Sequence, residues 1–391
     1  MLPFARMVKY GNKVAPPSGV LKIATSFAHM AMLFDTNNLY LRGLGSQYRL
    51  GNDSQDVVQN GWVQCPYKVS NVWCLFAATI ILTTDGEFYL AGQMGYLGVS
   101  ANPVPGWTNI TSRLSTIPGI TTVQDIASSE TAASNGSILI LLSNGDVYGL
   151  GRNTGGELGV TGAQSTPIKI DSGVTMIAGT QSGGALHYVK NTQYYRCGSN
   201  ANYNLGTTAS KLSTFTVSPD ISGSVIGISC STYTTSVLTS NRNNITVYSA
   251  GINTEYCLGI GYGDTKIIMS PFSATPAISG MVPDAGSMNN HSINYSVMAM
   301  TQNGKLYTCG SGVPLGWPVN TATDRSFFHQ VQYEGMDTPP DVNAFSVQGG
   351  SGLLYALVGT NEVYWCGSGT FMAEQSPPVQ QITMKKMILP E

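Results

Sequence analysis

The stretch GDVYGLGRNTGGELG at Gly145–Gly159 contains a turn, a tyrosine three residues before a glycine, a polar loop and a final Leu-Gly. The tyrosine and glycine recur together seven times, and we call each pair an anchor. The anchors are Tyr40 and Gly43, Tyr89 and Gly92, Tyr148 and Gly151, Tyr195 and Gly198, Tyr248 and Gly251, Tyr307 and Gly310, and Tyr364 and Gly367. Subtracting residue numbers gives spacings of 49, 59, 47, 53, 59 and 57 between successive anchor glycines, so the repeat fills the chain.

The flanks of the anchors repeat as well. Asp85-Gly86, Asn144-Gly145 and Asn303-Gly304 precede three of them, and such dipeptides favour type I′ hairpins, which need positive φ at both central residues. A short apolar run lies before each turn. After the anchor, a loop ends in Leu-Gly in six copies, at Gly51, Gly98, Gly159, Gly206, Gly259 and Gly316. Each unit therefore predicts about four short strands with tight turns and little helix.

Four-stranded units at this period are typical of propeller blades. The order of turn, Val-Tyr-x-x-Gly, polar loop and Leu-Gly resembles the regulator of chromosome condensation repeat over essentially the whole chain. We therefore predict an all-β fold, a seven-bladed β-propeller of four-stranded antiparallel blades, with an N-terminal arm at residues 1–19 and a single propeller at residues 20–391. The resemblance implies a ring closed by strands from both termini, in which Ser376–Ile388 adds a strand beside the blade begun near Val20–Phe34.

We interpret the anchor residues as structural. A glycine allows backbone conformations or close approaches that a side chain would forbid. The tyrosines are expected to pack between blades, with each hydroxyl finding a partner near the rim. Three cysteines precede the anchor glycine in three different blades, which favours a shared packing role; they are Cys197, Cys309 and Cys366.

Composition excludes several classes of function. Only 10% of the residues are charged, against about 25% in an average soluble domain, and the net charge is −2. The chain has no basic excess for nucleic-acid binding and no apolar run of the roughly 20 residues that a membrane-spanning helix needs. Seven scattered cysteines and four histidines show no metal-ligand spacing. We therefore expect no nucleic-acid partner, no membrane insertion, no metal and no cofactor.

Our first hypothesis is a non-enzymatic structural or recognition propeller. The sequence lacks the common motifs for nucleophilic catalysis, zinc hydrolysis and phosphate binding, so we assign no catalytic residue. A neutral Ser/Thr/Asn-rich surface and the absence of a secretory signal favour a virion component made in the host cytoplasm, such as a bacteriophage tail, collar or fibre-associated protein. Its expected partners are other structural proteins of the assembly, or a host-surface protein or glycan.

Two alternatives remain open. The resemblance implies a cytosolic interaction scaffold or a guanine-nucleotide exchange factor for a small GTPase. The N-terminal arm carries only Arg6, Lys9 and Lys13 as basic residues, and the acidic residues are scattered along the chain. A bacterial surface adhesin is the other alternative, because neutral polar loops suit glycan binding.

Overall fold

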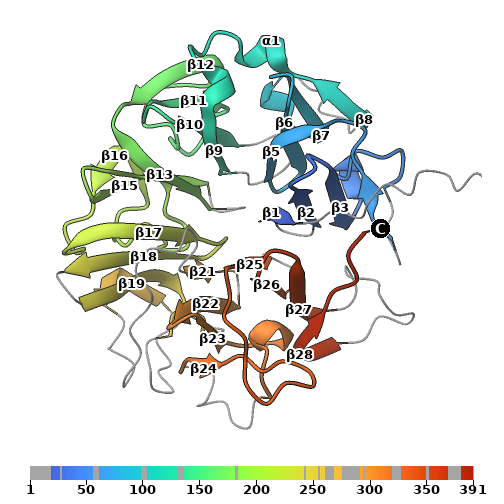
Figure 1. Cartoon of the computed structure of the whole chain (residues 1–391). Coiled ribbons are helices and arrows are strands. Elements are labelled where there is room, and N and C mark those ends of the chain that lie inside the picture. Colours follow the sequence, from blue (N-terminus) through green and yellow to red (C-terminus); the bar gives the residue numbers. More distant parts are fainter. Residues whose placement is uncertain are drawn as a thin grey trace, which may run out of the picture.

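Seven antiparallel four-stranded sheets surround a central axis in the computed structural model of the chain (Figure 1). The predicted all-β, seven-bladed propeller is therefore confirmed. The only α-helix among the described residues is the single turn α1 (Thr111–Leu114). The structure describes residues 19–26, 29–55, 61–97, 104–129, 136–180, 184–241, 244–253, 256–259, 268–274, 291–293, 296–318, 327–348, 352–368 and 380–390.

The strands of each blade follow one another in sequence, with the first strand innermost. Blade 1 contains β1 (Val20–Thr25), β2 (His29–Phe34), β3 (Leu39–Gly43) and β4 (Val63–Gln64). Blade 2 contains β5 (Val69–Cys74), β6 (Ala78–Thr83), β7 (Phe88–Gly92) and β8 (Val104–Asn109). Blade 3 contains β9 (Val123–Ser128), β10 (Ser137–Leu142), β11 (Val147–Gly151) and β12 (Gln164–Asp171).

The other four blades repeat this order. Blade 4 contains β13 (Val174–Gly179), β14 (Ala185–Lys190), β15 (Gln193–Ser199) and β16 (Lys211–Val217). Blade 5 contains β17 (Ser224–Cys230), β18 (Thr234–Asn241), β19 (Asn244–Ile252) and β20 (Ile268–Ala274). Blade 6 contains β21 (His291–Ile293), β22 (Val297–Gln302), β23 (Lys305–Gly310) and β24 (His329–Gln330), and blade 7 contains β25 (Ala344–Gln348), β26 (Leu353–Val358), β27 (Glu362–Ser368) and β28 (Gln380–Lys386). In the described connections, 3-10 turns lie at η1 (Ser46–Tyr48), η2 (Gly95–Leu97), η3 (Ile120–Thr122) and η4 (Val313–Leu315).

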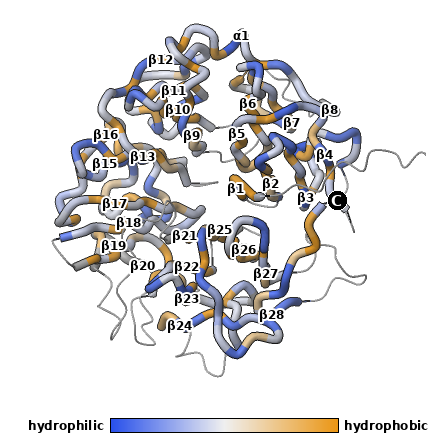
Figure 2. Tube along the Cα trace, in the orientation of Figure 1, coloured by the Kyte–Doolittle hydropathy of each residue, from blue (hydrophilic) through white to orange (hydrophobic). Residues whose placement is uncertain are grey.

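The hydrophobic core is divided among the seven interfaces between neighbouring blades. Each of the seven buried clusters joins two adjacent blades; for example, Leu139 of blade 3 packs in one cluster with Leu186 of blade 4. Figure 2 shows the matching hydrophobic stretches along the strands of the blades. A ring of small cores explains how one domain exceeds the roughly 250–300 residues at which a single core stops growing.

The Leu-Gly loops hold neighbouring blades together at the rim. Gly51 follows β3 of blade 1 and lies under the ring of Trp107 in β8 of blade 2. A Cβ at Gly51 would lie 2.2 Å from that indole, so only glycine fits. Similar contacts to an aromatic ring of the next blade occur at Gly159, Gly206 and Gly259.

The prediction that strands from both termini share a blade is wrong. The tail forms β28, which pairs with β27 and completes blade 7, while blade 1 takes all four strands from the N-terminal part of the propeller. The outer edge of β28 is occupied by the connection after β24: Met384 N–H donates to the carbonyl of Gln332 at 2.8 Å. That pairing and the burial of Met384 hold the tail on blade 7.

Blades 1 and 7 still meet and close the ring, by contacts rather than by a shared sheet. Val20 N–H donates to the carbonyl of Thr360 at 2.6 Å, and Trp62 Nε1 donates to the carbonyl of Ile388 at 3.1 Å. The side chain of Met387 packs in one buried cluster with residues of both blades. Figure 1 accordingly shows the C-terminus beside blade 1.

Candidate functional site

The anchor residues lie at equivalent places in all seven blades, in the third strand. The anchor glycines have φ values between +112° and +141°. At Gly198, for example, a Cβ would lie 2.4 Å from the carbonyl oxygen of Gly184 in the neighbouring strand connection, so a side chain cannot fit. The anchors therefore shape the blades and form no shared site.

The anchor tyrosines lie on the flanks of the blades. Those of blades 1, 3 and 7 are buried, and the others are half-buried. The hydroxyl of Tyr89 donates to Glu87 at 2.8 Å, and that of Tyr248 shares a hydrogen bond with Ser222 at 2.7 Å. These partners are local to each blade and hold the rings in place.

A repeated asparagine two residues after the anchor glycine was missed in the sequence. In blade 3, Asn153 Nδ2 donates to the carbonyls of Val160 and Gly162, and its Oδ1 accepts from Leu158 N–H. Asn200 makes the equivalent three bonds in blade 4, and Asn253 accepts the equivalent N–H in blade 5. Aligning the repeats as Gly-x-Asn-x₄-Leu-Gly would have found this asparagine. Its hydrogen bonds go to the backbone of its own loop, so we interpret its role as structural.

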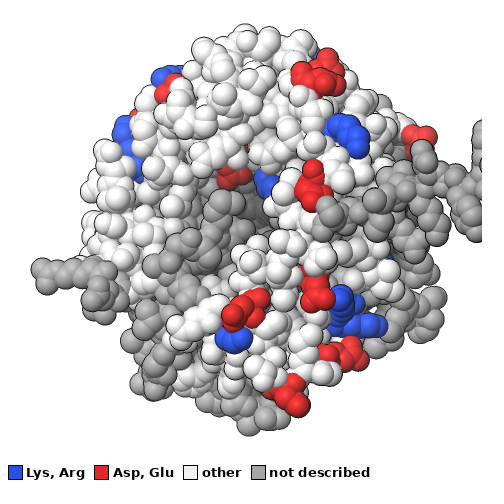
Figure 3. All heavy atoms as spheres, in the orientation of Figure 1, with Lys and Arg blue, Asp and Glu red and all other residues white. Residues whose placement is uncertain are grey.

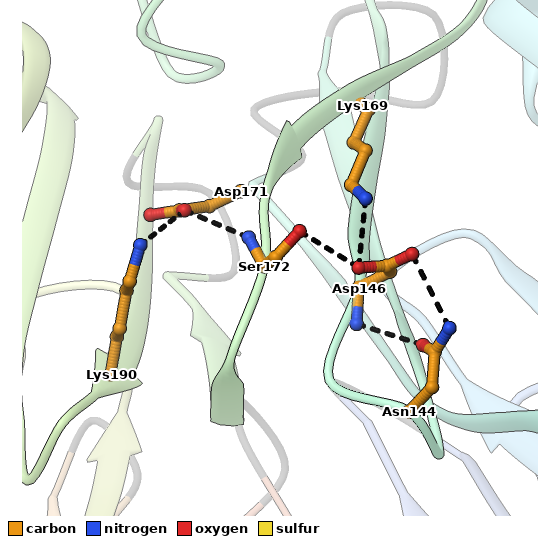
Figure 4. Close-up of polar contacts among 6 residues, drawn as sticks. All are labelled: Asn144, Asp146, Lys169, Asp171, Ser172 and Lys190. Carbon is orange, nitrogen blue, oxygen red and sulfur yellow. Dashed lines mark hydrogen bonds and ion pairs between the residues drawn. The ribbon is translucent and has the colours of Figure 1, made fainter.

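An ion network joins the outer part of blade 3 to blade 4 (Figure 4). Asp146 accepts from Lys169 Nζ at 2.9 Å and from the Ser172 hydroxyl at 2.8 Å. Asp171 accepts from Ser172 N–H and from Lys190 of β14. The hydrogen bond from Lys169 lowers the pKa of Asp146. These charged groups satisfy one another across the two blades, so we interpret the network as structural.

The wall of the central channel has a different polar cluster. Lys22, Asn71 and Asp125 are the third residues of β1, β5 and β9, the innermost strands of three consecutive blades. Lys22 Nζ donates to Asn71 Oδ1 at 2.8 Å and lies 5.0 Å from the ring centre of Trp73 in β5. Figure 3 shows a hollow at the centre of the ring, with basic and acidic groups side by side in it. We call Lys22, Asn71, Trp73 and Asp125 the polar wall.

Both charged groups of the polar wall are partly removed from water. Burial lowers the pKa of Lys22, with Asp125 acting in the opposite direction. Burial also raises the pKa of Asp125, against the effects of Lys22, the Ile126 N–H and the Trp73 indole. Removing charged groups from water costs free energy unless partners replace the lost hydration. The polar wall is therefore our candidate functional site.

The buried histidines and cysteines have structural settings. His29 shares hydrogen bonds of 2.8 Å with Ser26 and with Thr79 of blade 2, and burial lowers its pKa well below the usual value. All seven cysteines are free thiols. Six are buried and Cys230 is half-buried, and burial raises the pKa of Cys230 to about 12. Such thiols stay protonated and unreactive at neutral pH.

The part of the chain that the structure describes contains no group of three or more His, Cys, Asp or Glu side chains placed to hold a metal ion. In the same residues, no helix has both the length and the apolar character needed to cross a bilayer.

Comparison with known proteins identifies the fold. No family model and no curated protein matches the sequence. Among solved structures, human WBSCR16 superposes with a TM-score of 0.67 at 17% identity, covering 87% of each chain. Yeast RCC1 (Prp20) in its complex with Kap60 gives a TM-score of 0.66 at 15% identity, covering 85% of this chain and 78% of that one. Prp20p from Saccharomyces cerevisiae also gives 0.66, at 14% identity, covering 84% and 80%.

The chain therefore has the fold of the RCC1-like seven-bladed propellers, as the repeat indicated. At these identities the likeness concerns the fold alone. Sequence reasoning also missed the polar wall, because its residues differ in type from blade to blade. Aligning the buried valines that begin β1, β5 and β9 would have brought Lys22, Asn71 and Asp125 into register.

Proposed function

We propose that this propeller is a non-enzymatic protein that binds other proteins, as a structural component of a virion such as a bacteriophage tail, collar or fibre. The observation that carries the proposal is the low charge of the chain, with 10% charged residues and a net charge of −2; on the face drawn in Figure 3, charges of both signs are scattered among uncharged residues. Neutral polar surfaces favour contacts by shape and hydrogen bonding over electrostatic steering.

The first experiment locates the protein. Purified particles from the lysate are analysed by quantitative mass spectrometry and by labelling with an antibody against the propeller. We expect the chain at a fixed whole-number ratio to a tail or collar protein. Its absence from the particles, with the chain recovered instead from the host cytoplasm, contradicts the virion assignment.

The second experiment tests the nature of the interface. The partner defined in the particle is bound to the isolated propeller at about 0.05 M and about 0.5 M salt, where the Debye length falls from about 14 Å to about 4 Å. A neutral interface predicts an affinity that changes less than about threefold. A loss of a hundredfold or more, as charge-dominated binding shows, contradicts a neutral docking face.

An exchange factor for a small GTPase is the second candidate. The likeness to the fold of yeast RCC1 favours it, since one of those structures was described together with binding of Prp20p to Gsp1p and histones. The test is the release of a fluorescent guanine nucleotide from a small GTPase of the same source. Acceleration by catalytic amounts of the propeller supports exchange, and an unchanged release rate rejects it.

A further inference from the structure

The innermost strands of three consecutive blades carry polar side chains at one shared position. Blades 1, 2 and 3 place Lys22, Asn71 and Asp125 at the third position of their inner strands, whereas blade 4 places Met176 there. The same backbone position therefore accepts an apolar side chain. Because only 10% of the chain is charged, an ammonium and a carboxylate at this position need a reason beyond the fold.

The polar wall keeps unused hydrogen-bonding capacity. An ammonium group has three donors, and Lys22 uses one of them on Asn71. A carboxylate offers about four acceptor sites; Asp125 Oδ1 accepts from the N–H of Ile126 at 2.9 Å, and the carboxylate also interacts with the Trp73 indole. Among the described ion pairs, Lys22 and Asp125 are not paired with each other. Among the residues that the structure describes, donors and acceptors thus remain available on the inner strands of blades 1 and 3.

The charges of the wall select the class of ligand. Lys22 attracts an anion that Asp125 repels, and Asp125 attracts a cation that Lys22 repels, so the two charges together favour neither kind of simple ion. A hydroxyl group suits both, since it accepts from an ammonium and donates to a carboxylate.

We propose that the polar wall binds a sugar residue of a neutral glycan, with one hydroxyl accepting from Lys22 Nζ and another donating to the Asp125 carboxylate. This site is independent of the proposed virion role, because a sugar can bind the isolated propeller whatever protein holds it in place.

The experiment follows the indole of Trp73, which lies beside both charged groups. The full chain is labelled with ¹⁵N, and a Trp73→Phe variant identifies the Trp73 signal among the five indole resonances. Glucose, galactose, mannose and N-acetylglucosamine are each titrated to about 50 mM, well above a millimolar dissociation constant. We expect a saturable shift of the Trp73 indole signal with at least one sugar.

Two variants connect that shift to the polar wall. Lys22→Met and Asp125→Asn each remove one charge-assisted hydrogen bond and should weaken the sugar about tenfold or more. Lys169→Met, which breaks an ion pair outside the channel, is the control and should leave the affinity unchanged. Asp125→Asn keeps the size of the side chain, so it remains informative if Lys22→Met does not fold.

Three results would overturn the proposal. One is the absence of a saturable Trp73 shift with all four sugars. Another is an equal shift with sodium sulfate or with glycine at the same concentrations, which would define a site for ions or zwitterions. The third is sugar affinity that both channel variants retain in full.

Discussion

Lowering the pH from about 7.5 to about 5 should destabilise the propeller, because His187 has to remain uncharged in the fold. His187 is fully buried in β14, and its Nδ1 shares a hydrogen bond of 2.7 Å with the hydroxyl of Tyr194. Its Nε2 is buried and has no hydrogen-bond partner among the residues that the structure describes. Burial, with a further contribution from the Arg196 charge, lowers the pKa of His187 to about 3. A second proton on the ring would find no acceptor among the described residues. The positive charge that it adds would also be repelled by the guanidinium of Arg196.

The magnitude follows from proton linkage. In the unfolded chain a histidine has a pKa of about 6.5, so below that pH the unfolded state binds a proton that the folded state excludes. Stability is therefore lost as the pH falls below about 6.5, and the loss continues until the folded pKa of about 3 is reached. Between pH 7.5 and 5 this amounts to about 2 kcal/mol for His187 alone. His29, whose pKa burial also lowers, acts in the same direction.

The assay is urea unfolding of the wild type and of His187→Asn at several pH values between 7.5 and 5. Asparagine can keep the hydrogen bond to Tyr194 but does not titrate, so the variant should lose about 2 kcal/mol less over this range. Burial raises the pKa of Glu157 and Asp125, which opposes the histidine effect in both proteins and cancels in the comparison. Parallel pH profiles for the two proteins would refute the reasoning.

Three further outcomes are expected. In thermal unfolding, Gly198→Ala should lower the free energy of unfolding by about 3 kcal/mol or more, because the added Cβ meets the Gly184 carbonyl oxygen. Gly162, with φ +75°, has open space around it, so Gly162→Ala should cost only about 1–2 kcal/mol in the same assay. Met387→Ala should cost about 2–4 kcal/mol by opening a cavity where the ring closes, while the 39% exposed Met336 tolerates alanine within about 0.5 kcal/mol; equal effects contradict that closure. Native protein should react slowly with a thiol reagent such as iodoacetamide at pH 7.5 and label at all seven cysteines only when unfolded; rapid native labelling at any of the six buried cysteines contradicts their burial.

The sequence predicted the blades because the signals that form them are local. The apolar run at Ser137–Leu142 became the buried second strand of blade 3, and Gly145 in the following turn has φ +84°. The stretch Thr166–Gly179, which connects two units, divides into the outermost strand of blade 3 and the innermost strand of blade 4. Turn chemistry and alternation decide such elements within a few residues.

Ring closure failed as a prediction because it depends on contacts between distant segments. A strand was expected within Ser376–Ile388, and β28 lies there, but its sheet was assigned wrongly. The partner of β28 is decided by the burial of Met384 and by its pairing with Gln332, which follows β24. The alternation of β28 would suit the edge of either blade, so local pattern alone could not choose between blades 1 and 7.

The fold restricts some positions of this repeat and leaves others free to vary. Residues that shape the blade are tightly restricted: the anchor glycine by its backbone conformation, and the valine that begins β1, β5, β9 and β13 by its burial. The third position of these inner strands is not restricted, since it holds lysine, asparagine, aspartate or methionine. A charge at a restricted position would destabilise a blade, whereas the third position is only partly buried and holds a charge in two blades. The blades are otherwise equivalent but differ at the third position. In a propeller with so few charged residues, we therefore expect ligand-binding residues at this position.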